Sequence, residues 1–280
     1  MHNPKAYYRP KTLDEALSLV AGQQGAVALS GGALTFGALD LPYETVIDLQ
    51  DIPELRQIEI RGDSVSIGGA ATLQQVVESP LVRDVLKRSI TRTLPLNIRN
   101  NTSVAESLKA KDPPREWFAA LVAWDVGVEQ LLPTGERVID GIASLLKGTT
   151  EQTLSSGIIT CINIPALTAR EAFGTAYVAR TPADIPIVNA AIYLMLDDNG
   201  NVDFPFAAMC GASVDGVVNL HLETLDGNPL NEANIASAAK WVMAQVDPVG
   251  DYRGSAEYRR EMARVTVQRA LMDCKNQLGL

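Results

Sequence analysis

Two adjacent glycines carry the clearest chemical signal in this sequence. The stretch Ser30-Gly31-Gly32 follows the short apolar run 26–29, which is typical of a buried strand. Paired glycines let the backbone turn with positive φ and leave its N–H groups uncovered. Successive N–H dipoles in such a turn attract anions, so one interpretation is a phosphate-binding turn. The alternative is an ordinary turn between a strand and a loop, because the stretch matches neither a dinucleotide fingerprint nor a Walker loop.

The segments on either side of this turn predict an opening α/β unit. Thr12 precedes a run with apolar residues at helical spacing, and Glu15 completes the pattern of a capping box. A second apolar run, 45–49, predicts another strand. The glycine turn therefore lies at the carboxyl end of a strand, which is a common place for ligands in α/β folds.

The rest of the chain predicts further strands, helices and one boundary. Hydrophobic periodicity and turn residues predict hairpins and strands at 56–72, 126–139, 158–165, 206–211 and 217–222. The same signals predict helices at 81–94, 117–124, 185–196, 232–245 and 255–276, with a strand as the alternative for the end of 185–196. The polar stretch 97–108 has no clean period and is predicted to be a loop. Segment 166–171 is the predicted domain boundary, and Arg259, Arg260 and Arg264 are predicted to be solvated or salt-bridged.

Composition excludes several classes of protein. The chain has 280 residues, of which 46% are hydrophobic, and a formal net charge of -9. That charge argues against a nucleic-acid or anionic-membrane surface. No apolar run is long enough for a membrane span, and the N-terminal residues lack the pattern of a signal peptide, so we expect a cytoplasmic protein. The three cysteines are far apart in sequence, and neither histidine suggests a metal centre, so no metal site is expected.

Short stretches along nearly the whole chain resemble, in the same order, the FAD-binding (medium) subunits of the molybdenum hydroxylases. This family includes the flavoprotein subunits of carbon monoxide and xanthine dehydrogenases. The stretches that carry the resemblance are Tyr8-Arg9-Pro10, Ser30-Gly31-Gly32, 46–49 with 52–55, 67–72 with 79–80, 98–100 and 253–260. Their collinear order identifies the chain as a member of this family.

The resemblance implies a fold, a function and partners. The implied fold is α+β, with an FAD-binding-type domain at 1–168, made of subdomains at about 1–55 and 56–168, and a C-terminal domain at 169–280. Such a subunit passes electrons from iron–sulfur clusters in a small partner subunit through FAD to an acceptor. A large partner subunit carries the molybdopterin cofactor.

The resemblance also implies which residues meet the flavin. The backbone of Gly31, Gly32 and Ala33 would hold the diphosphate, Ser103 and Ser107 would assist, and Glu116 would lie near the ribose. The full implied set is Leu29, Ser30, Gly31, Gly32, Ala33, Leu34, Ser103, Ser107 and Glu116. No side chain is expected to act as an acid or base, because the flavin carries the chemistry.

The second flavin loop departs from the family pattern Arg-Asn-x-Gly-Thr-Ile-Gly-Gly-Asn. Here residues 99–107 contain none of its three glycines, and Ala105-Glu106 replaces the Gly-Gly pair. Glu106 brings a carboxylate to the place of a diphosphate, unless its side chain turns to solvent. Like charges about 4 Å apart at an effective dielectric constant near 20 repel by roughly 4 kcal/mol. That energy corresponds to about a thousandfold in affinity.

Three functions stay open at this point. The chain is a working flavoprotein subunit, or a homologue that keeps the fold and subunit contacts but binds FAD poorly, or the same cleft holds a ligand with less negative charge. FAD is therefore the expected cofactor, although Ala105 and Glu106, which replace the Gly-Gly pair of the family, argue against its binding. Whether the chain takes part in oxidoreductase chemistry depends on that site, and the sequence gives neither substrate nor electron acceptor.

Overall fold

The computed structural model describes residues 4–23, 25–32, 44–110, 113–143, 157–181, 184–214 and 216–280. These residues form two compact units, Met1–Pro113 with Asp125–Ala166, and Pro114–Trp124 with Leu167–Leu280. The sequence-based division at 168 and 169 assigned residues 114–124 to the first domain. In the structure they pack in the second unit.

The first unit begins with a small parallel sheet covered by a helix. Its strands β1 (Ala6–Tyr8), β3 (Thr45–Asp48) and β2 (Ala26–Leu29) lie in the order β1-β3-β2. Helix α1 (Leu13–Gly22) contributes buried Leu13 and Ala16 to the core beneath it. Thr12 caps α1 as predicted, by accepting a hydrogen bond from the N–H of Glu15. The predicted capping box is not completed, because the Glu15 carboxylate accepts from the N–H of Lys11 and not from that of Thr12.

A larger antiparallel sheet and several short helices complete the first unit. The strands are β4 (Ile58–Arg61), β5 (Ser64–Gly68), β8 (Ile158–Pro165), β6 (Gly127–Leu131) and β7 (Arg137–Gly141), paired in that order, which confirms the predicted hairpins. The helical segments are η1 (Pro53–Arg56), α2 (Leu73–Glu78), α3 (Asp84–Thr93), α4 (Leu96–Asn101) and α5 (Val104–Lys109). Thr72 and Gln75 form a capping box at the start of α2.

The prediction of a loop at 97–108 is wrong, because α4 and α5 occupy most of it. Ser103 caps α5, and its Oγ accepts a hydrogen bond from the N–H of Glu106 over 3.1 Å. Residues 104–108 are all buried. A helix of six residues is marginally stable alone and depends on tertiary packing. Because every side of this helix is buried, its sequence lacks the alternation of polar and apolar faces that marks a surface helix.

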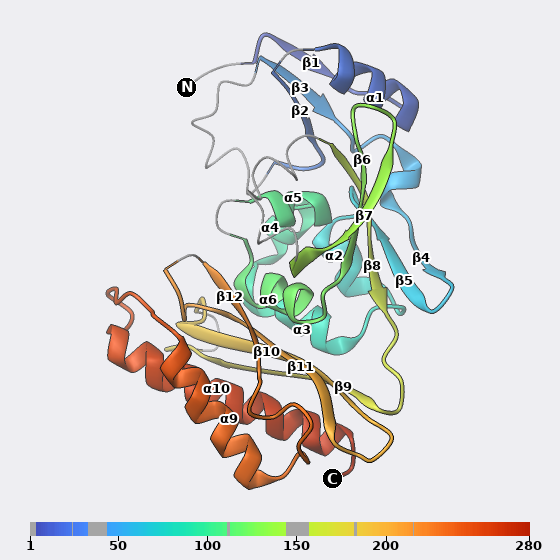
Figure 1. Ribbon diagram of the computed structural model, residues 1–280. Helices are drawn as coiled ribbons and strands as arrows, with labels where there is room; N and C mark the ends of the chain where they lie inside the picture. Colours follow the sequence, from blue (N-terminus) through green and yellow to red (C-terminus); the bar gives the residue numbers. More distant parts are fainter. Residues whose placement is uncertain are drawn as a thin grey trace. The chain divides into compact units, whose positions relative to one another are not determined.

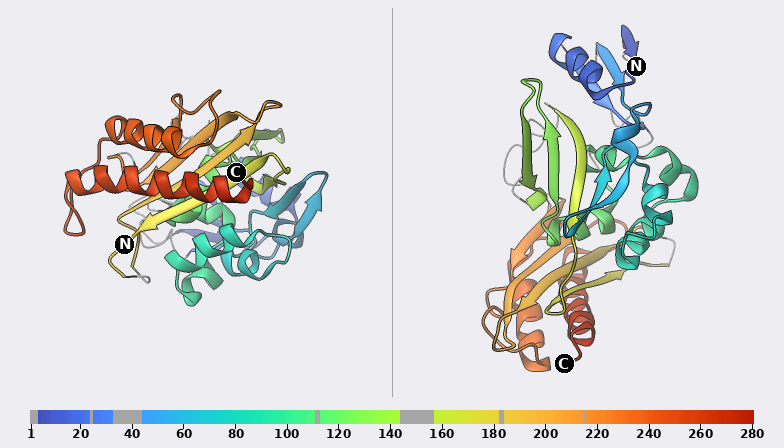
Figure 2. Two further views of the ribbon diagram at one scale, coloured as in Figure 1. Left: turned by 90° about the horizontal axis from the view of Figure 1, so that it is seen from below. Right: turned by 90° about the vertical axis from the view of Figure 1, so that its right-hand side faces the viewer.

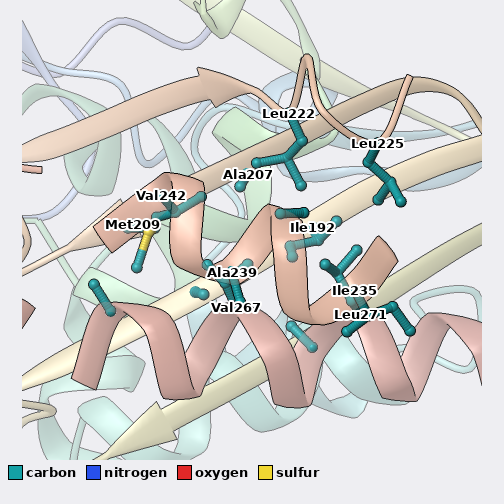
Figure 3. Packing of buried hydrophobic residues seen from close by; sticks show 14 of the residues in the cluster. Ile192, Ala207, Met209, Leu222, Leu225, Ile235, Ala239, Val242, Val267 and Leu271 are labelled. Carbon is teal, nitrogen blue, oxygen red and sulfur yellow. The ribbon is translucent and has the colours of Figure 1, made fainter. Parts of the chain in front are cut away.

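The second unit is an antiparallel sheet with helices on both faces (Figure 1). The strands β12 (Val217–His221), β11 (Val202–Cys210), β10 (Val188–Leu196) and β9 (Glu171–Val178) lie in that order. Helices α9 (Glu232–Gln245) and α10 (Ala256–Gln277) cover one face, and α10 crosses the strands in Figure 2. Figure 3 shows the apolar side chains between these helices and the sheet.

Helix α6 (Arg115–Ala123) packs on the opposite face of this sheet. The Cys210 Sγ donates to the Arg115 carbonyl over 3.4 Å, and the Trp124 and Phe173 rings stack with centroids 4.6 Å apart. Cys210 and Phe173 alternate along their strands with Met209 and Ala172, which face α9 and α10. Among the described helices, none has both the length and the apolar character needed to cross a membrane.

The predicted helix at 185–196 is also wrong, and the strand that was the alternative for its end is the form found. Residues 188–196 form β10, which pairs with both β9 and β11. A central strand covered on both faces is a nearly continuous apolar run, and such a run does not show the period of two that marks a half-buried strand. Pairing with two neighbouring strands, and not local pattern, therefore decides this segment.

Candidate functional site

The glycine turn after β2 lies against the start of α5. The Ser30 Oγ is 2.8 Å from the Ser103 Oγ, and it donates a longer hydrogen bond of 3.5 Å to the Gly69 carbonyl. Leu29, Ser30 and Ser103 are all buried. The structure therefore brings together the first and second predicted flavin loops, although they are 73 residues apart in sequence.

Glu106 fills the space in front of this turn. Its Oε2 accepts a hydrogen bond of 3.0 Å from the N–H of Gly32, and only 4% of the residue is exposed. Gly31 and Gly32 have φ values of 144° and 146°, which L-residues with a side chain rarely adopt. A Cβ on Gly31 would collide with the Glu106 carboxylate and would lie 2.8 Å from the Asn101 carbonyl oxygen. Position 31 therefore requires glycine. The N–H of Gly32 already donates to the side chain of Glu106.

Backbone hydrogen bonds fix the position from which Glu106 reaches the turn. The N–H of Val104 donates to the Ala71 carbonyl over 2.9 Å, and the N–H of Ala105 donates to the Gly69 carbonyl over 2.8 Å. Together with the Ser103 cap, these bonds anchor the first turn of α5 to the segment that follows β5. The anchored backbone of α5 thus fixes the point from which the buried Glu106 side chain extends to the turn.

The other predicted site residues are placed as follows. The Ser107 Oγ donates to the Val104 carbonyl within α5 over 2.7 Å. Glu116 is buried on α6 and so belongs to the second unit. Ala33 and Leu34 lie outside the described residues.

Sequence reasoning missed the helical form of the second loop and the contribution of Asn101 to its surroundings. The signal was present, because Ser103-x-x-Glu106 is the pattern of a capping box and marks a helix start. In the structure Ser103 does cap α5, while the Glu106 carboxylate reaches across to Gly32.

Two family descriptions together match most of the chain. Residues 3–167 match the FAD binding domain in molybdopterin dehydrogenase, and residues 175–274 match the CO dehydrogenase flavoprotein C-terminal domain. The chain belongs to the flavoprotein (medium) subunit family of the molybdenum hydroxylase-type dehydrogenases. The family resemblance inferred from the sequence and the α+β fold are both confirmed.

Relatives and solved structures agree with this membership over the whole length. The glyceraldehyde dehydrogenase medium chain of Sulfolobus acidocaldarius is 25% identical, with 98% of this chain and 99% of that protein covered. The carbon monoxide dehydrogenase medium chain of Hydrogenophaga pseudoflava is 25% identical, with 95% of each covered. A structure of carbon monoxide dehydrogenase from H. pseudoflava superposes with a TM-score of 0.84 at 22% identity, covering 99% of both chains, and at that identity it shows the fold alone.

The residues at the turn, as they stand, do not fit the diphosphate of FAD. A diphosphate would need the uncovered N–H groups of the glycine turn. Here the Gly32 N–H donates to Glu106, and the carboxylate would face phosphate oxygens of the same charge. The space that a Cβ on Gly31 would enter also holds that carboxylate and the Asn101 carbonyl.

Lys109, at the end of α5, gives a prediction about stability. Its Nζ donates to the Gly157 carbonyl over 3.1 Å, and burial lowers the pKa of its ammonium from 10.5 to about 8. Burial of the charged amine therefore lowers the free energy of unfolding. This loss is complete below about pH 8 and disappears as the pH rises from about 8 to 10.5. We expect Lys109→Met to raise the free energy of unfolding at pH 7 by roughly 1–3 kcal/mol, with the gain lost above pH 10.5.

Urea titrations of the full chain at pH 7, 9 and 10.5 measure this effect. Lys11→Met is the control, because the exposed Lys11 ammonium pairs with Asp51 and such surface pairs contribute about 0–1 kcal/mol. A Lys109→Met protein that is less stable than the wild type at every pH would show that the bond to Gly157 outweighs the cost of burial.

Proposed function

We propose that this chain is the medium subunit of a molybdenum hydroxylase-type complex, and that it supplies the fold and the subunit contacts while binding FAD weakly or not at all. The proposed partners are a small subunit with iron–sulfur clusters and a large subunit with the molybdopterin cofactor. Relatives named as medium chains support this place in a complex. We infer weak FAD binding from the hydrogen bond between the Gly32 N–H and the Glu106 carboxylate.

The energy of this contact sets the expected weakness. An incoming diphosphate must either lie beside the carboxylate or displace it from its hydrogen bond. In the first case the repulsion is roughly 4 kcal/mol at about 4 Å and an effective dielectric constant near 20. In the second case the carboxylate loses a charge-assisted hydrogen bond, which contributes about 1.5–3 kcal/mol. Either route lowers the affinity by at least about tenfold.

Purification of the complex from the native host tests both parts of the proposal. We expect the three subunits to elute together in gel filtration, with iron–sulfur and molybdenum content but without flavin bands in the visible spectrum. Recovery of the chain alone, with no neighbouring genes for such subunits, would contradict the assembly. Stoichiometric flavin in the eluted complex would contradict the statement about FAD.

A second function has a specific observation in its favour. Gly31 and Gly32 have positive φ values, which suit a phosphate-binding turn, and Ser103, one of the implied flavin residues, lies beside it with its Oγ 2.8 Å from the Ser30 Oγ. On that function the chain binds FAD and passes electrons from the clusters to an acceptor, with no side chain acting as acid or base. The same purified complex distinguishes the two, because a working subunit shows flavin bands that bleach when the substrate of the complex is added.

A further inference from the structure

We infer that Glu106 is the resident anion of the glycine turn: its carboxylate replaces an external phosphate and holds the turn after β2 against α5 when no cofactor is bound. This inference rests on the proposed function for the identity of the turn as a phosphate site. It adds that the Gly32–Glu106 contact, which opposes binding of the diphosphate, also stabilises the folded chain without a cofactor.

Glu106 and the Gly32 N–H satisfy each other as hydrogen-bond partners. Glu106 is 4% exposed, and a buried carboxylate requires hydrogen-bond donors. The part-buried Gly32 N–H is such a donor, and the carboxylate is the acceptor that it uses. Removal of the carboxylate therefore leaves an N–H group at the turn without this acceptor, and an external anion can then supply it.

The Gly32–Glu106 contact joins two different parts of the first unit. The turn belongs to the small parallel sheet, whereas α5 is anchored through Gly69 and Ala71 to the segment after β5. The hydrogen bonds between the turn and this region include those of the Ser30 hydroxyl and the Gly32–Glu106 bond. The last of these is charge-assisted, which makes it roughly twice as strong as a neutral hydrogen bond. Glu106 thus connects the turn after β2 to α5, a connection that a bound phosphate would otherwise make.

The competing explanation is that Glu106 only supports the start of α5, as the glutamate of a capping box does. In that case a variant without the carboxylate loses stability, but an added anion does not restore it. Restoration by an anion is the property that separates a resident anion from a helix cap.

Thermal unfolding of the full chain, with and without inorganic pyrophosphate, tests the inference. Glu106→Ala and Glu106→Gln are compared with the wild type and with Glu136→Gln, which changes an exposed carboxylate on the β6–β7 turn. Sodium chloride at matched ionic strength controls for screening. We expect Glu106→Ala to lower the melting temperature by on the order of 5 °C. Pyrophosphate at millimolar concentration should restore most of that loss saturably, with a smaller effect on Glu106→Gln and none on the wild type.

Two results would overturn the inference: an unchanged melting temperature for Glu106→Ala, or an equal effect of pyrophosphate on the wild type and the variant. If Glu106→Ala does not fold, hydrogen exchange of the Gly32 amide in Glu106→Gln replaces it. Faster exchange than in the wild type, slowed again by pyrophosphate, is then expected, and unchanged protection of that amide would contradict the inference. Tight FAD binding by the wild type contradicts the proposed function, but it leaves these stability measurements to decide the role of Glu106.

Discussion

Ala105→Gly combined with Glu106→Gly should raise the affinity of the full chain for FAD by orders of magnitude. The double substitution restores the Gly-Gly pair of the family pattern, and it removes the carboxylate that accepts the Gly32 hydrogen bond. The electrostatic part has an upper scale of roughly 4 kcal/mol, or about a thousandfold. A smaller part comes from the backbone, because glycine at 105 and 106 permits conformations in which N–H groups approach a phosphate.

Isothermal titration of FAD into four proteins separates these parts. Glu106→Gln keeps the size of the side chain and removes the charge, so its gain over the wild type measures electrostatics alone. The further gain of the double glycine variant measures the backbone. Glu136→Gln is the control for a change of net charge at an exposed site. If the wild type already binds FAD at about micromolar affinity or better and Glu106→Gln changes nothing, Glu106 does not obstruct the diphosphate.

Arg259→Ala should lower the free energy of unfolding of the second unit by roughly 1–3 kcal/mol, the cost of leaving a buried carbonyl acceptor without its donor. Arg259 is 3% exposed, and its Nη2 lies 2.6 Å from the Asp251 carboxylate. Its Nη1 also donates to the Ile187 carbonyl over 2.6 Å and to the Gly211 carbonyl over 3.3 Å. The guanidinium therefore joins the loop before α10 to the start of β10 and the end of β11. Its loss leaves the carboxylate and two carbonyls without this donor.

The charge of Asp251 is part of the same arrangement. Burial alone would raise the pKa of its carboxyl, but hydrogen bonds from Arg253 and Arg259 outweigh that effect and hold the pKa well below its usual range. Asp251 therefore stays ionised down to acidic pH in the wild type. In Arg259→Ala it loses one of its two arginine partners.

Arg260→Ala is the matched control, one residue along the same helix. Arg260 is 38% exposed and lies 3.6 Å from Asp247, which is almost fully exposed. Such a pair contributes about 0–1 kcal/mol, so its removal is expected to change the denaturant midpoint little. Arg259→Lys, which keeps the charge but not the planar fork, should fall between the two. A loss of less than about 1 kcal/mol in Arg259→Ala would show that water replaces the guanidinium.

Local sequence determined the elements with strong caps and a clear period. Helix α9 begins after Asn231 and α10 after Ser255, and both caps accept the expected backbone hydrogen bond. The hairpins at β4–β5 and β6–β7 follow from alternation around a turn. The prediction that Arg259 and Arg260 are solvated or salt-bridged also agrees with their partners. Only the structure shows that the Arg259 guanidinium is buried, while its partner Asp251 stays partly exposed.

The sequence by itself identified the family, the glycine turn and the acidic residue in the second loop, because these depend on residue types in a fixed order. It could not say that 188–196 is a central strand or that 104–109 is helical, because pairing and burial by distant segments decide both. Nor could it say where the Glu106 carboxylate points. A side chain that could turn to water or to Gly32 is directed by the hydrogen bonds that anchor α5 to Gly69 and Ala71, and those bonds exist only in the folded chain.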